Sequence, residues 1–249
     1  MAVNRPLPSD PRDRIYDPLR RVNLGRSVQW ALLARPSLRL DRLPVFDGCG
    51  IYALYYVGSL PLYAPISSAD CEVPIYVGKA DPEGGRKGLN VRPAWEGRKL
   101  RNRLGQHGRK LDASKDFKAE QFYARYLPAD DLFTPMAERL MISGFHPVWN
   151  LVLDGFGVNP QGGRREAEQL RPAWHELHRG VPWAERMTSH QVSATELAMR
   201  VSVHLGIYSK PSPDVAIPGQ AALSDDQLDA QPSLFPDVVH RDFDDQSGL

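Results

Sequence analysis

The pattern of apolar and polar residues predicts three β-strands in the first half of the chain. The longest is Gly50–Gly58, a run of aromatic and β-branched residues bounded by glycines. A shorter run of the same kind occupies Pro74–Lys79, and a third occupies Phe122–Leu127. Residues 59–73 join the first two runs and contain two prolines, so we expect a loop there and not a tight hairpin.

Two helices are predicted between and after these strands. The first spans about Glu96–Leu111, where leucines recur at positions i, i+4 and i+11 of one face. Arg103 and His107, four positions apart, project together from a neighbouring face. The second helix begins near Thr134, which we expect to be its N-cap, with Pro135 in the first helical position.

A single carboxylate, Glu138, lies within this second, largely apolar helix. Burying a carboxylate is costly unless it finds a cation, so Glu138 is a candidate for an ion pair or a metal site. The element ends at Pro147–Asn150. The order strand, strand, helix, strand, helix predicts an α/β (α+β) fold, with helices flanking a small three-stranded, mostly antiparallel sheet.

The rest of the chain predicts extensions around this domain. Residues 1–45 read as a proline-punctuated N-terminal arm with a short helix around Ser27–Leu33, and residues 46–190 as the main domain. We expect a helical extension over 191–208, centred on Ser193–Leu205, and a disordered acidic tail over 209–249.

Charge is divided unevenly along the chain, although the 249 residues carry a formal net charge of only +1. Residues 211–249 hold eight Asp, one Arg and no Lys or Glu, while residues 79–110 hold ten Lys or Arg and three acids. A basic body of this kind suits a polyanionic partner, because each cation placed on a phosphate releases counterions.

Several classes of protein are excluded. Two cysteines, Cys49 and Cys71, are too few for a disulfide framework or a thiolate zinc site. There is no run of about 18 apolar residues of the kind that spans a membrane, and the N-terminus does not resemble a signal peptide. We therefore expect a soluble, cytoplasmic protein.

Five residue positions form a candidate hydrolytic site. Tyr52 and Tyr76 lie on two of the predicted strands, Arg103 and His107 share a helix face, and Glu138 lies on the other helix. Phosphodiester cleavage needs a base for water, a cation for the phosphate and a carboxylate for Mg²⁺. A tyrosine is a poor base unless a cation stabilises its phenolate, and Lys79 could supply that charge. Tyrosines in strands are more often packing residues, so spacing alone favours that explanation.

The same residues resemble a known family. Gly50-Ile51-Tyr52 followed by Tyr76-Val77-Gly78 is similar to the paired motif of the GIY-YIG nuclease superfamily, and the resemblance covers about residues 46–190. Later residues also match the superfamily in order: the helix segment Leu100–His107 with its Arg and downstream His, then Glu138, then Asn150. The tyrosines are 24 positions apart, wider than the compact spacing typical of the superfamily. The longer connection, with Pro147–Asn150 and Gly155–Gly157, resembles the branch formed by type II restriction endonucleases.

This resemblance implies a role for each matched residue. It implies that Tyr52 is the general base, assisted by Lys79, and that Tyr76 contacts the phosphate or a metal-bound water. Arg103 would neutralise charge on the phosphate, and His107 would orient Tyr52 or the phosphate. The metal ligand would be Glu138, holding one Mg²⁺ per active site (with Mn²⁺ able to substitute), and the residue that braces the site would be Asn150.

Double-stranded DNA is the partner that the resemblance implies. Specificity would come from basic loops, whose candidate nucleic-acid-binding residues are Arg86, Lys87, Arg92, Arg98, Arg164 and Arg165. Because each such active site cuts one strand, we expect a homodimer on a palindromic site. A cognate DNA methyltransferase is expected as the partner of such a restriction enzyme.

Two further motifs are weighed separately. His175 and His178 could suggest a metal pair, but no third ligand stands nearby and the segment reads as a docking helix around Trp174 and Trp183. In the tail, Gln231-Pro232-Ser233-Leu234-Phe235 resembles the short peptides by which bacterial proteins bind the replication sliding clamp. Gln231, Leu234 and Phe235 would make that contact, and an inert acidic tail is the alternative.

The sequence therefore predicts a Mg²⁺-dependent, sequence-specific DNA endonuclease of the restriction type. Two alternatives stay open: a repair or mobile-element nuclease that nicks DNA, and a DNA-binding accessory protein that has lost its chemistry. The second requires that a complete set of candidate catalytic residues be retained without a function.

Overall fold

The computed structural model describes residues 17–82, 93, 95–159 and 169–210. Four strands form its sheet: β1 (Leu38–Arg39), β2 (Gly50–Tyr56), β3 (Tyr76–Ala80) and β4 (Phe122–Pro128). The principal helices are α1 (Arg21–Leu33), α2 (Lys99–Ala113), α3 (Thr134–Phe145) and α8 (Ala194–Tyr208). Shorter helices are η2 (Leu40–Arg42), η3 (Pro61–Ile66), η5 (Ala119–Gln121), α4 (Val148–Leu151), α6 (Ala173–Leu177) and α7 (Pro182–Glu185).

The sheet has the order β1-β4-β2-β3, and every neighbouring pair is antiparallel. The predicted α/β class and all three predicted strands are confirmed, with ends that differ by one or two residues. The sequence pattern missed β1, because two residues are too few to show an alternation. In register, Tyr52 of β2 lies opposite Gly78 of β3 and Tyr126 of β4.

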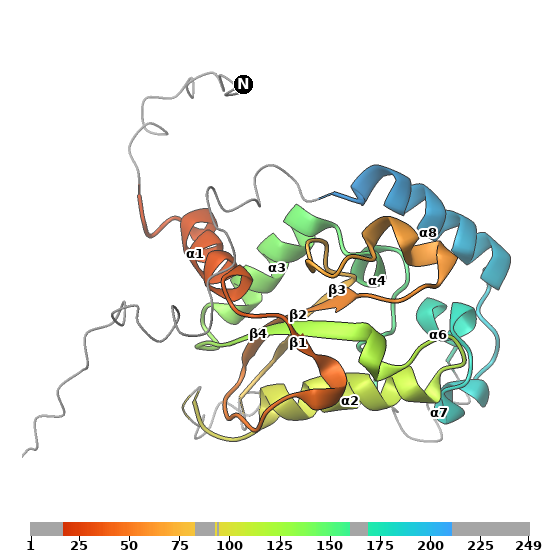
Figure 1. The fold of residues 1–249 in the computed structure, drawn as a ribbon, viewed down its shortest axis with the longest axis horizontal. Coiled ribbons are helices and arrows are strands. Elements are labelled where there is room, and N and C mark those ends of the chain that lie inside the picture. Colours follow the sequence, from red (N-terminus) through yellow and green to blue (C-terminus); the bar gives the residue numbers. More distant parts are fainter. Residues whose placement is uncertain (1–16, 83–92, 94, 160–168, 211–249) are drawn as a thin grey trace, which may run out of the picture. The chain divides into compact units, whose positions relative to one another are not determined.

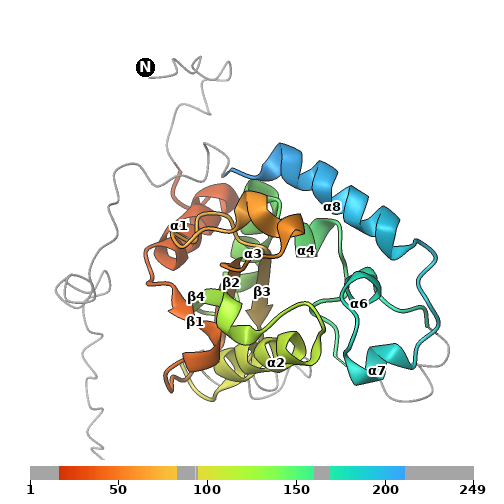
Figure 2. The same cartoon turned by 45° about the vertical axis from the view of Figure 1, so that its right-hand side comes forward.

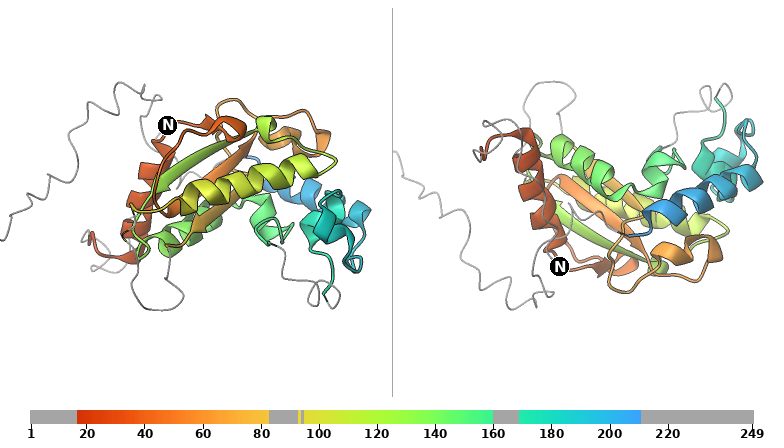
Figure 3. Two further views of the ribbon diagram at one scale, coloured as in Figure 1. Left: turned by 90° about the horizontal axis from the view of Figure 1, so that it is seen from below. Right: turned by 90° about the horizontal axis from the view of Figure 1, so that it is seen from above.

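Helices cover both faces of the sheet (Figure 1). Helix α2 lies on one face, and α1 and α3 lie on the other, as the views from below and above in Figure 3 also show. The central strand β2 is buried along its whole length. Tyr52 belongs to the cluster under α2, whereas Ile51 and Tyr55 belong to the cluster under α1 and α3. The alternation of the strand thus directs Tyr52 toward α2, and Tyr76 of β3 shares that face.

The C-terminal helices pack beyond strand β3, where α6, α7 and α8 lie together (Figure 2). The buried Arg171 side chain ties this region together. It donates hydrogen bonds to the carbonyl oxygens of Ala184 and Met187 and forms a 2.8 Å ion pair with Glu176. Helix α8 confirms the predicted helical extension, and Ser193 caps it by accepting a hydrogen bond from the Glu196 amide.

Two local predictions need correction. Helix α1 begins at Arg21, earlier than the predicted Ser27, because residues 19–35 contain no proline and the helix packs along α3. Thr134 is the first residue of α3 and not its cap; its hydroxyl donates a hydrogen bond to the Asp130 carbonyl instead. Most of the predicted arm and tail lies outside the described residues. No helix within the described ranges is long and apolar enough to cross a membrane.

Candidate active site

The centre of the site is a hydrogen bond between a strand and a helix. The Tyr52 hydroxyl on β2 lies 2.6 Å from Nε2 of His107 on α2. Both side chains are buried. The other ring nitrogen of His107, Nδ1, finds no hydrogen-bond partner among the residues that the structure describes. Burial, together with the charges of Arg103 and Lys110, lowers the pKa of His107 well below its usual range, so its ring is neutral.

The glycine of the second motif explains how Tyr52 reaches this position. Gly78 lies directly opposite Tyr52 in the β2–β3 ladder. A Cβ atom at Gly78 would lie 2.5 Å from the Tyr52 hydroxyl oxygen and 2.9 Å from the Tyr76 ring. A side chain there would therefore displace both tyrosines. The Tyr-Val-Gly motif supplies one tyrosine and leaves space for the other.

Tyr76 and Arg103 lie beside this pair. The Tyr76 ring is half-buried, and its centroid lies 6.2 Å from that of Tyr52 and 5.4 Å from that of His107. Burial raises the pKa of both phenols, and the Arg103 guanidinium acts in the opposite direction on each. Arg103 is thus the cation that acts on the tyrosines. Its Nη2 is anchored 2.5 Å from the Gly157 carbonyl oxygen.

A turn at residues 156–158 packs against the buried side of the site, where it contacts His107, Tyr76 and Arg103. The Phe156 ring stacks on the His107 ring with centroids 4.6 Å apart, and meets the Tyr76 ring edge-on at 4.9 Å. Two basic side chains of α2 hold this turn: Arg103 through the carbonyl of Gly157, and the buried Lys110 through those of Phe156 and Val158, each 2.5 Å from Nζ.

Sequence reasoning singled out the glycines around Phe156 but missed Lys110. No ion pair joins Lys110 to a carboxylate within the described ranges, and burial, followed by the charge of Arg103, lowers the pKa of Lys110 to about 7. The available signal was its position on α2, three residues after His107 and one before Leu111 of the apolar row. Such a position predicts a partly buried side chain, but its carbonyl partners are 46 and 48 residues away.

Glu138 and Lys79 approach the site from the other side of β3. In β3, Lys79 alternates with Gly78 and therefore leaves the strand on the α3 face. Its Nζ lies 2.5 Å from Asp81 Oδ1. Its charge is also the largest influence that lowers the pKa of Glu138. The structure thus brings Lys79 to the carboxylates, and it is Arg103 that stands beside the tyrosines.

Glu138 has the properties of a cation ligand. It is half-buried, and burial, with a smaller effect from Asp81, raises the pKa of its carboxyl. No hydrogen bond or ion pair to this carboxylate is found among the described residues. No group of three or more His, Cys, Asp or Glu within the described ranges is placed to hold a metal. A lone carboxylate still fits Mg²⁺, which keeps several waters and is commonly bound by one or two carboxylates plus substrate phosphate.

Asn150 lies at the free edge of β3. Its side-chain Oδ1 accepts a hydrogen bond from the Val77 amide at 2.8 Å, and its Nδ2 donates to the Val77 carbonyl at 2.9 Å. The Asn150 side-chain amide thereby takes the hydrogen-bonding position of a neighbouring strand. It pairs with the backbone N–H and C=O of Val77, the edge residue that follows Tyr76. This geometry braces the strand and does not direct the Asn150 side chain to the reacting groups.

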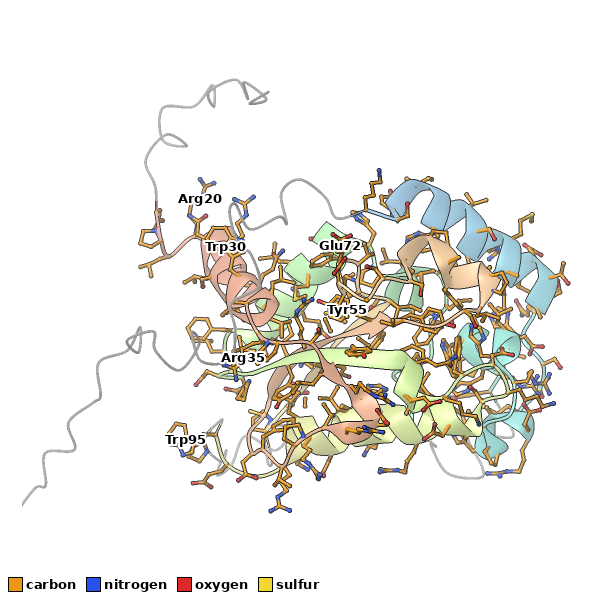
Figure 4. All side chains as sticks on the ribbon, viewed as in Figure 1. Arg20, Trp30, Arg35, Tyr55, Glu72 and Trp95 are labelled. Atoms are coloured by element: carbon orange, nitrogen blue, oxygen red, sulfur yellow. The ribbon has the colours of Figure 1, made fainter. Side chains whose placement is uncertain are left out.

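The candidate DNA-contact residues lie mostly outside the described residues. Arg86, Lys87, Arg92, Arg164 and Arg165 fall there, as do the tail residues Gln231, Leu234 and Phe235. Arg98 is described, and its Nε lies 3.4 Å from Asp47 Oδ1. Sequence reasoning missed its neighbour Trp95, which is 73% exposed and projects away from the body of the protein (Figure 4).

His175 and His178 do not form a metal pair. The His178 ring lies in the core, with Nε2 2.6 Å from the Tyr63 hydroxyl and Nδ1 2.7 Å from Asp116 Oδ2. Neither ring nitrogen of the buried His175 has a partner within the described residues, and burial lowers its pKa to about 3. Its ring instead packs against Trp183, as the docking-helix interpretation predicts.

The sheet, the two motif tyrosines and the Arg–His helix define a nuclease domain of the GIY-YIG class. A family model described as the Eco29kI GIY-YIG domain matches residues 44–205, well over half of the chain. The chain belongs to this family, a restriction endonuclease family within the GIY-YIG superfamily, whose nucleases are generally metal-dependent and whose substrate is DNA. No curated protein matches the chain.

Proposed function

We propose that this protein is a sequence-specific endonuclease that hydrolyses phosphodiester bonds of double-stranded DNA with one Mg²⁺ per active site. The observation that carries the proposal is the Tyr52–His107 hydrogen bond beside Arg103. A buried hydroxyl on a neutral imidazole, next to a guanidinium, supplies a proton acceptor and a phosphate-binding cation within one site. Membership of a restriction endonuclease family supports the same reaction.

In the proposed mechanism Tyr52 acts as the base. As water attacks phosphorus, its proton passes to the Tyr52 oxygen, and the Tyr52 hydroxyl proton passes to Nε2 of His107. The imidazole can accept this proton because its Nε2 already lies 2.6 Å from the hydroxyl. This route avoids a free phenolate, which burial disfavours by raising the pKa of Tyr52. Burial and the charges of Arg103 and Lys110 also disfavour the imidazolium that forms instead, so the negative charge of the bound phosphate would have to stabilise it.

Tyr76 controls access to this base. Tyr52 is fully buried in the structure, whereas Tyr76 lies half-buried beside it. We therefore infer that the Tyr76 ring moves aside when DNA binds and that its hydroxyl then contacts the scissile phosphate. Arg103, held by the Gly157 carbonyl, would neutralise the charge that develops on the same phosphate.

Glu138 would hold the cation, and Lys79 would balance the charge around it. A bound Mg²⁺ supplies Lewis-acid stabilisation of the phosphate and leaving oxygen, and Mn²⁺ would substitute for it. The Lys79–Asp81 pair keeps a cation near Glu138 and limits repulsion between the two carboxylates. Asn150 would brace β3 so that Tyr76 and Lys79 keep their positions on opposite faces.

DNA recognition would come from basic residues, most of which lie outside the described residues. Arg98 and the residues around 86–92 and 164–165 would contact bases or phosphates. As a restriction enzyme the protein would act as a homodimer on a palindromic site, and a cognate methyltransferase would protect the host DNA. The tail motif at 231–235 remains a hypothesis for a clamp contact.

Digestion of unmethylated phage DNA tests the proposal. The wild-type protein with Mg²⁺ should give discrete fragments, and Glu138→Gln should reduce their yield at least 10²-fold because it removes the metal ligand. The matched control is Glu120→Gln, which changes an exposed carboxylate on η5 in the same way. Nicked circles, or cleavage of branched DNA alone, would favour the repair or mobile-element alternative. Binding without any cleavage would identify an accessory protein, and full activity in Glu138→Gln would overturn the metal assignment.

A further inference from the structure

Helix α2 borders a groove that the proposed mechanism does not use. The groove has a volume of about 480 Å³ and lies between α2 and the segment around η2. Arg101, Asn102, Gln106 and Arg109 line it from α2, and none of these four residues is buried. Each of these side chains can donate hydrogen bonds, so the groove suits a ligand that is rich in acceptor oxygens.

The cations of the groove are not neutralised within the described part of the chain. Arg101 donates from Nε to the Pro44 carbonyl oxygen at 3.0 Å, and no carboxylate of the described residues pairs with it or with Arg109. Asp41 also lines the groove, but Arg39 engages its carboxylate by donating from Nε and Nη2 at 3.0 Å each. The groove therefore keeps an excess of positive charge.

A glycine leaves room for one of these cations. Gly105 also lines the groove, and a Cβ atom at this position would lie 3.5 Å from Nη1 of Arg109. The Arg109 guanidinium therefore lies over the backbone of α2 at the groove, and the residue is exposed. A planar guanidinium in such a position can bind two oxygens of one phosphate.

Gln106 joins the groove to the candidate active site. Its Oε1 lies 3.4 Å from Nη1 of Arg103 and 3.3 Å from Nδ2 of Asn159, so the groove ends one side chain from the guanidinium assigned to the scissile phosphate. Arg109 follows Arg103 by six positions, or about 9 Å along the helix axis. One strand of DNA advances about 3.4 Å per nucleotide. The groove is therefore within reach of phosphates a few nucleotides from the scissile one.

We propose that this groove binds the phosphodiester backbone of the DNA substrate beside the scissile phosphate, with Arg101 and Arg109 as its phosphate-binding residues. The inference rests on the proposed nuclease function. Because Oε1 of Gln106 accepts from Arg103, the Nε2 of Gln106 is left to donate to the same backbone. Contacts of this kind carry no base readout, so they would hold the duplex in register and add affinity for every sequence.

The competing occupant is the acidic segment 211–249, which carries a formal charge of −7. DNA is favoured because the groove adjoins Arg103, where a phosphate must bind during cleavage. An acidic segment held in the groove would compete with DNA, and removal of the groove arginines would then strengthen DNA binding. The two occupants therefore predict opposite effects of the same substitution.

Binding of a fluorescently labelled DNA duplex by the full-length protein, in EDTA and over a series of salt concentrations, is the first experiment. The double variant Arg101→Gln/Arg109→Gln should raise the Kd about tenfold or more. It should also lower the slope of log Kd against log salt by about 2, because two phosphate contacts are lost. The control, Lys115→Gln/Arg186→Gln, removes two exposed cations that do not line the groove and should keep the wild-type slope.

The other outcomes separate this proposal from the nuclease function. A double variant that binds DNA like the control would overturn the groove assignment, even if the wild type cleaves DNA with Mg²⁺. A double variant that binds DNA more tightly than the wild type would overturn it too and would identify the acidic segment as the occupant. A wild type that binds no duplex would overturn both proposals together.

Site-directed cross-linking then locates the DNA. The native Cys49 and Cys71 are both buried, so an introduced surface thiol is the reactive one. Asn102→Cys keeps both groove arginines, and with a photoactivatable cross-linker on its thiol it should capture the labelled duplex in high yield. Gln191→Cys, at an exposed neutral position before α8, should give only background. Equal yields from the two variants would contradict the placement of DNA in the groove.

Discussion

The Tyr52–His107 pair of the candidate site has a counterpart in the core, formed by Tyr63 and His178. In each, a buried tyrosine hydroxyl lies 2.6 Å from Nε2 of a buried histidine. Burial raises the pKa of both phenols and lowers the pKa of both imidazoles. The central hydrogen bond is therefore the same in the two places, and the surroundings make the difference.

The core pair has all its hydrogen-bonding positions filled. Asp116 accepts from Nδ1 of His178 at 2.7 Å, which fixes the proton on Nδ1 and makes Nε2 the acceptor of the Tyr63 hydroxyl. The Tyr63 oxygen in turn accepts the Trp149 indole N–H at 3.0 Å. A chain with each donor and acceptor paired holds its protons in place, as a structural network should.

The histidine of the site pair lacks such an outer partner in the part of the chain that the structure describes. Nδ1 of His107 has no hydrogen-bond partner within the described residues, so no contact fixes its tautomer. Two cations, Arg103 and Lys110, stand beside it where the core pair has an anion. The imidazole can therefore donate a proton to Tyr52 or accept one from it. The comparison shows that the same hydrogen bond can hold a core together or move a proton, according to what completes it.

Removing the two hydroxyls should separate these roles, and the largest effect is expected at the site. Tyr52→Phe should reduce the single-turnover cleavage rate about 10³-fold, because it removes the proposed proton acceptor. Its free energy of unfolding should fall by about 1–3 kcal/mol, because one buried nitrogen, Nε2 of His107, loses its partner. Single-turnover assays and urea denaturation measure the two quantities. Cleavage within threefold of the wild-type rate would rule out Tyr52 as the base.

The matched change in the core should have the opposite profile. Tyr63→Phe leaves the Trp149 N–H and His178 Nε2 without partners, so the free energy of unfolding should fall by about 2–4 kcal/mol. Cleavage measured well below the melting temperature should stay within a few-fold of the wild type. A thousandfold loss of cleavage with normal stability would show that the core pair also takes part in the chemistry.

The two Tyr–His pairs differ in how far the sequence predicts them. The site residues belong to motifs, so Tyr52, Tyr76, Arg103, His107 and Glu138 could be named from the chain. The structure places the first four close together between the sheet and α2, and Glu138 lies on α3. Strands β2, β3 and β4 were equally readable, because their length and apolar content distinguish them.

The core pair could not be predicted in this way. Tyr63 lies on a short helix within the connection between two strands, and its partner is 115 residues away. No periodicity links such positions, since only tertiary packing brings them together. The same reason hides the contacts of Lys110 with the turn at 156–158 and the pairing of the two-residue strand β1.

The next prediction concerns the cations that distinguish the site pair. The pKa of Lys110 is about 7 in the folded protein and that of an unfolded lysine is 10.5, so between these values the unfolded chain binds more protons. The free energy of unfolding of the wild type should therefore rise with pH over this window, by at most about 1.4 kcal/mol per pH unit, and be unaffected by this group below pH 7. Lys110→Met should lack that rise.

Urea denaturation at pH 6.5 and 8.5 measures the difference. The control is Lys115→Met, which removes an exposed lysine just beyond the end of the same helix and should retain the wild-type slope. Equal slopes in the wild type and Lys110→Met would contradict the buried, uncompensated position of Lys110. Between pH 8.5 and pH 6.5 the cleavage rate should fall less in Lys110→Met than in the wild type. The variant lacks one of the cations that oppose proton transfer to His107.

The smallest effect on the free energy of unfolding is expected from a change at Asp116, the anion beside His178 of the core pair. Asp116→Asn keeps an acceptor for Nδ1 of His178 but removes the charge, so the free energy of unfolding at pH 8 should fall by about 1 kcal/mol. Asp116 raises the pKa of His178 against the larger effect of burial, and its loss lowers that pKa further. Just below pH 6.5 both proteins lose stability alike, because burial lowers the folded pKa of His178 in each. The gap between variant and wild type should widen once the pH falls below the folded pKa of wild-type His178, where the wild-type fold takes up the proton and the variant fold still refuses it. Asp131→Asn, at an exposed position, should show no such widening. An unchanged cleavage rate would complete the contrast with the site pair, where removal of one hydroxyl is expected to slow the reaction about 10³-fold.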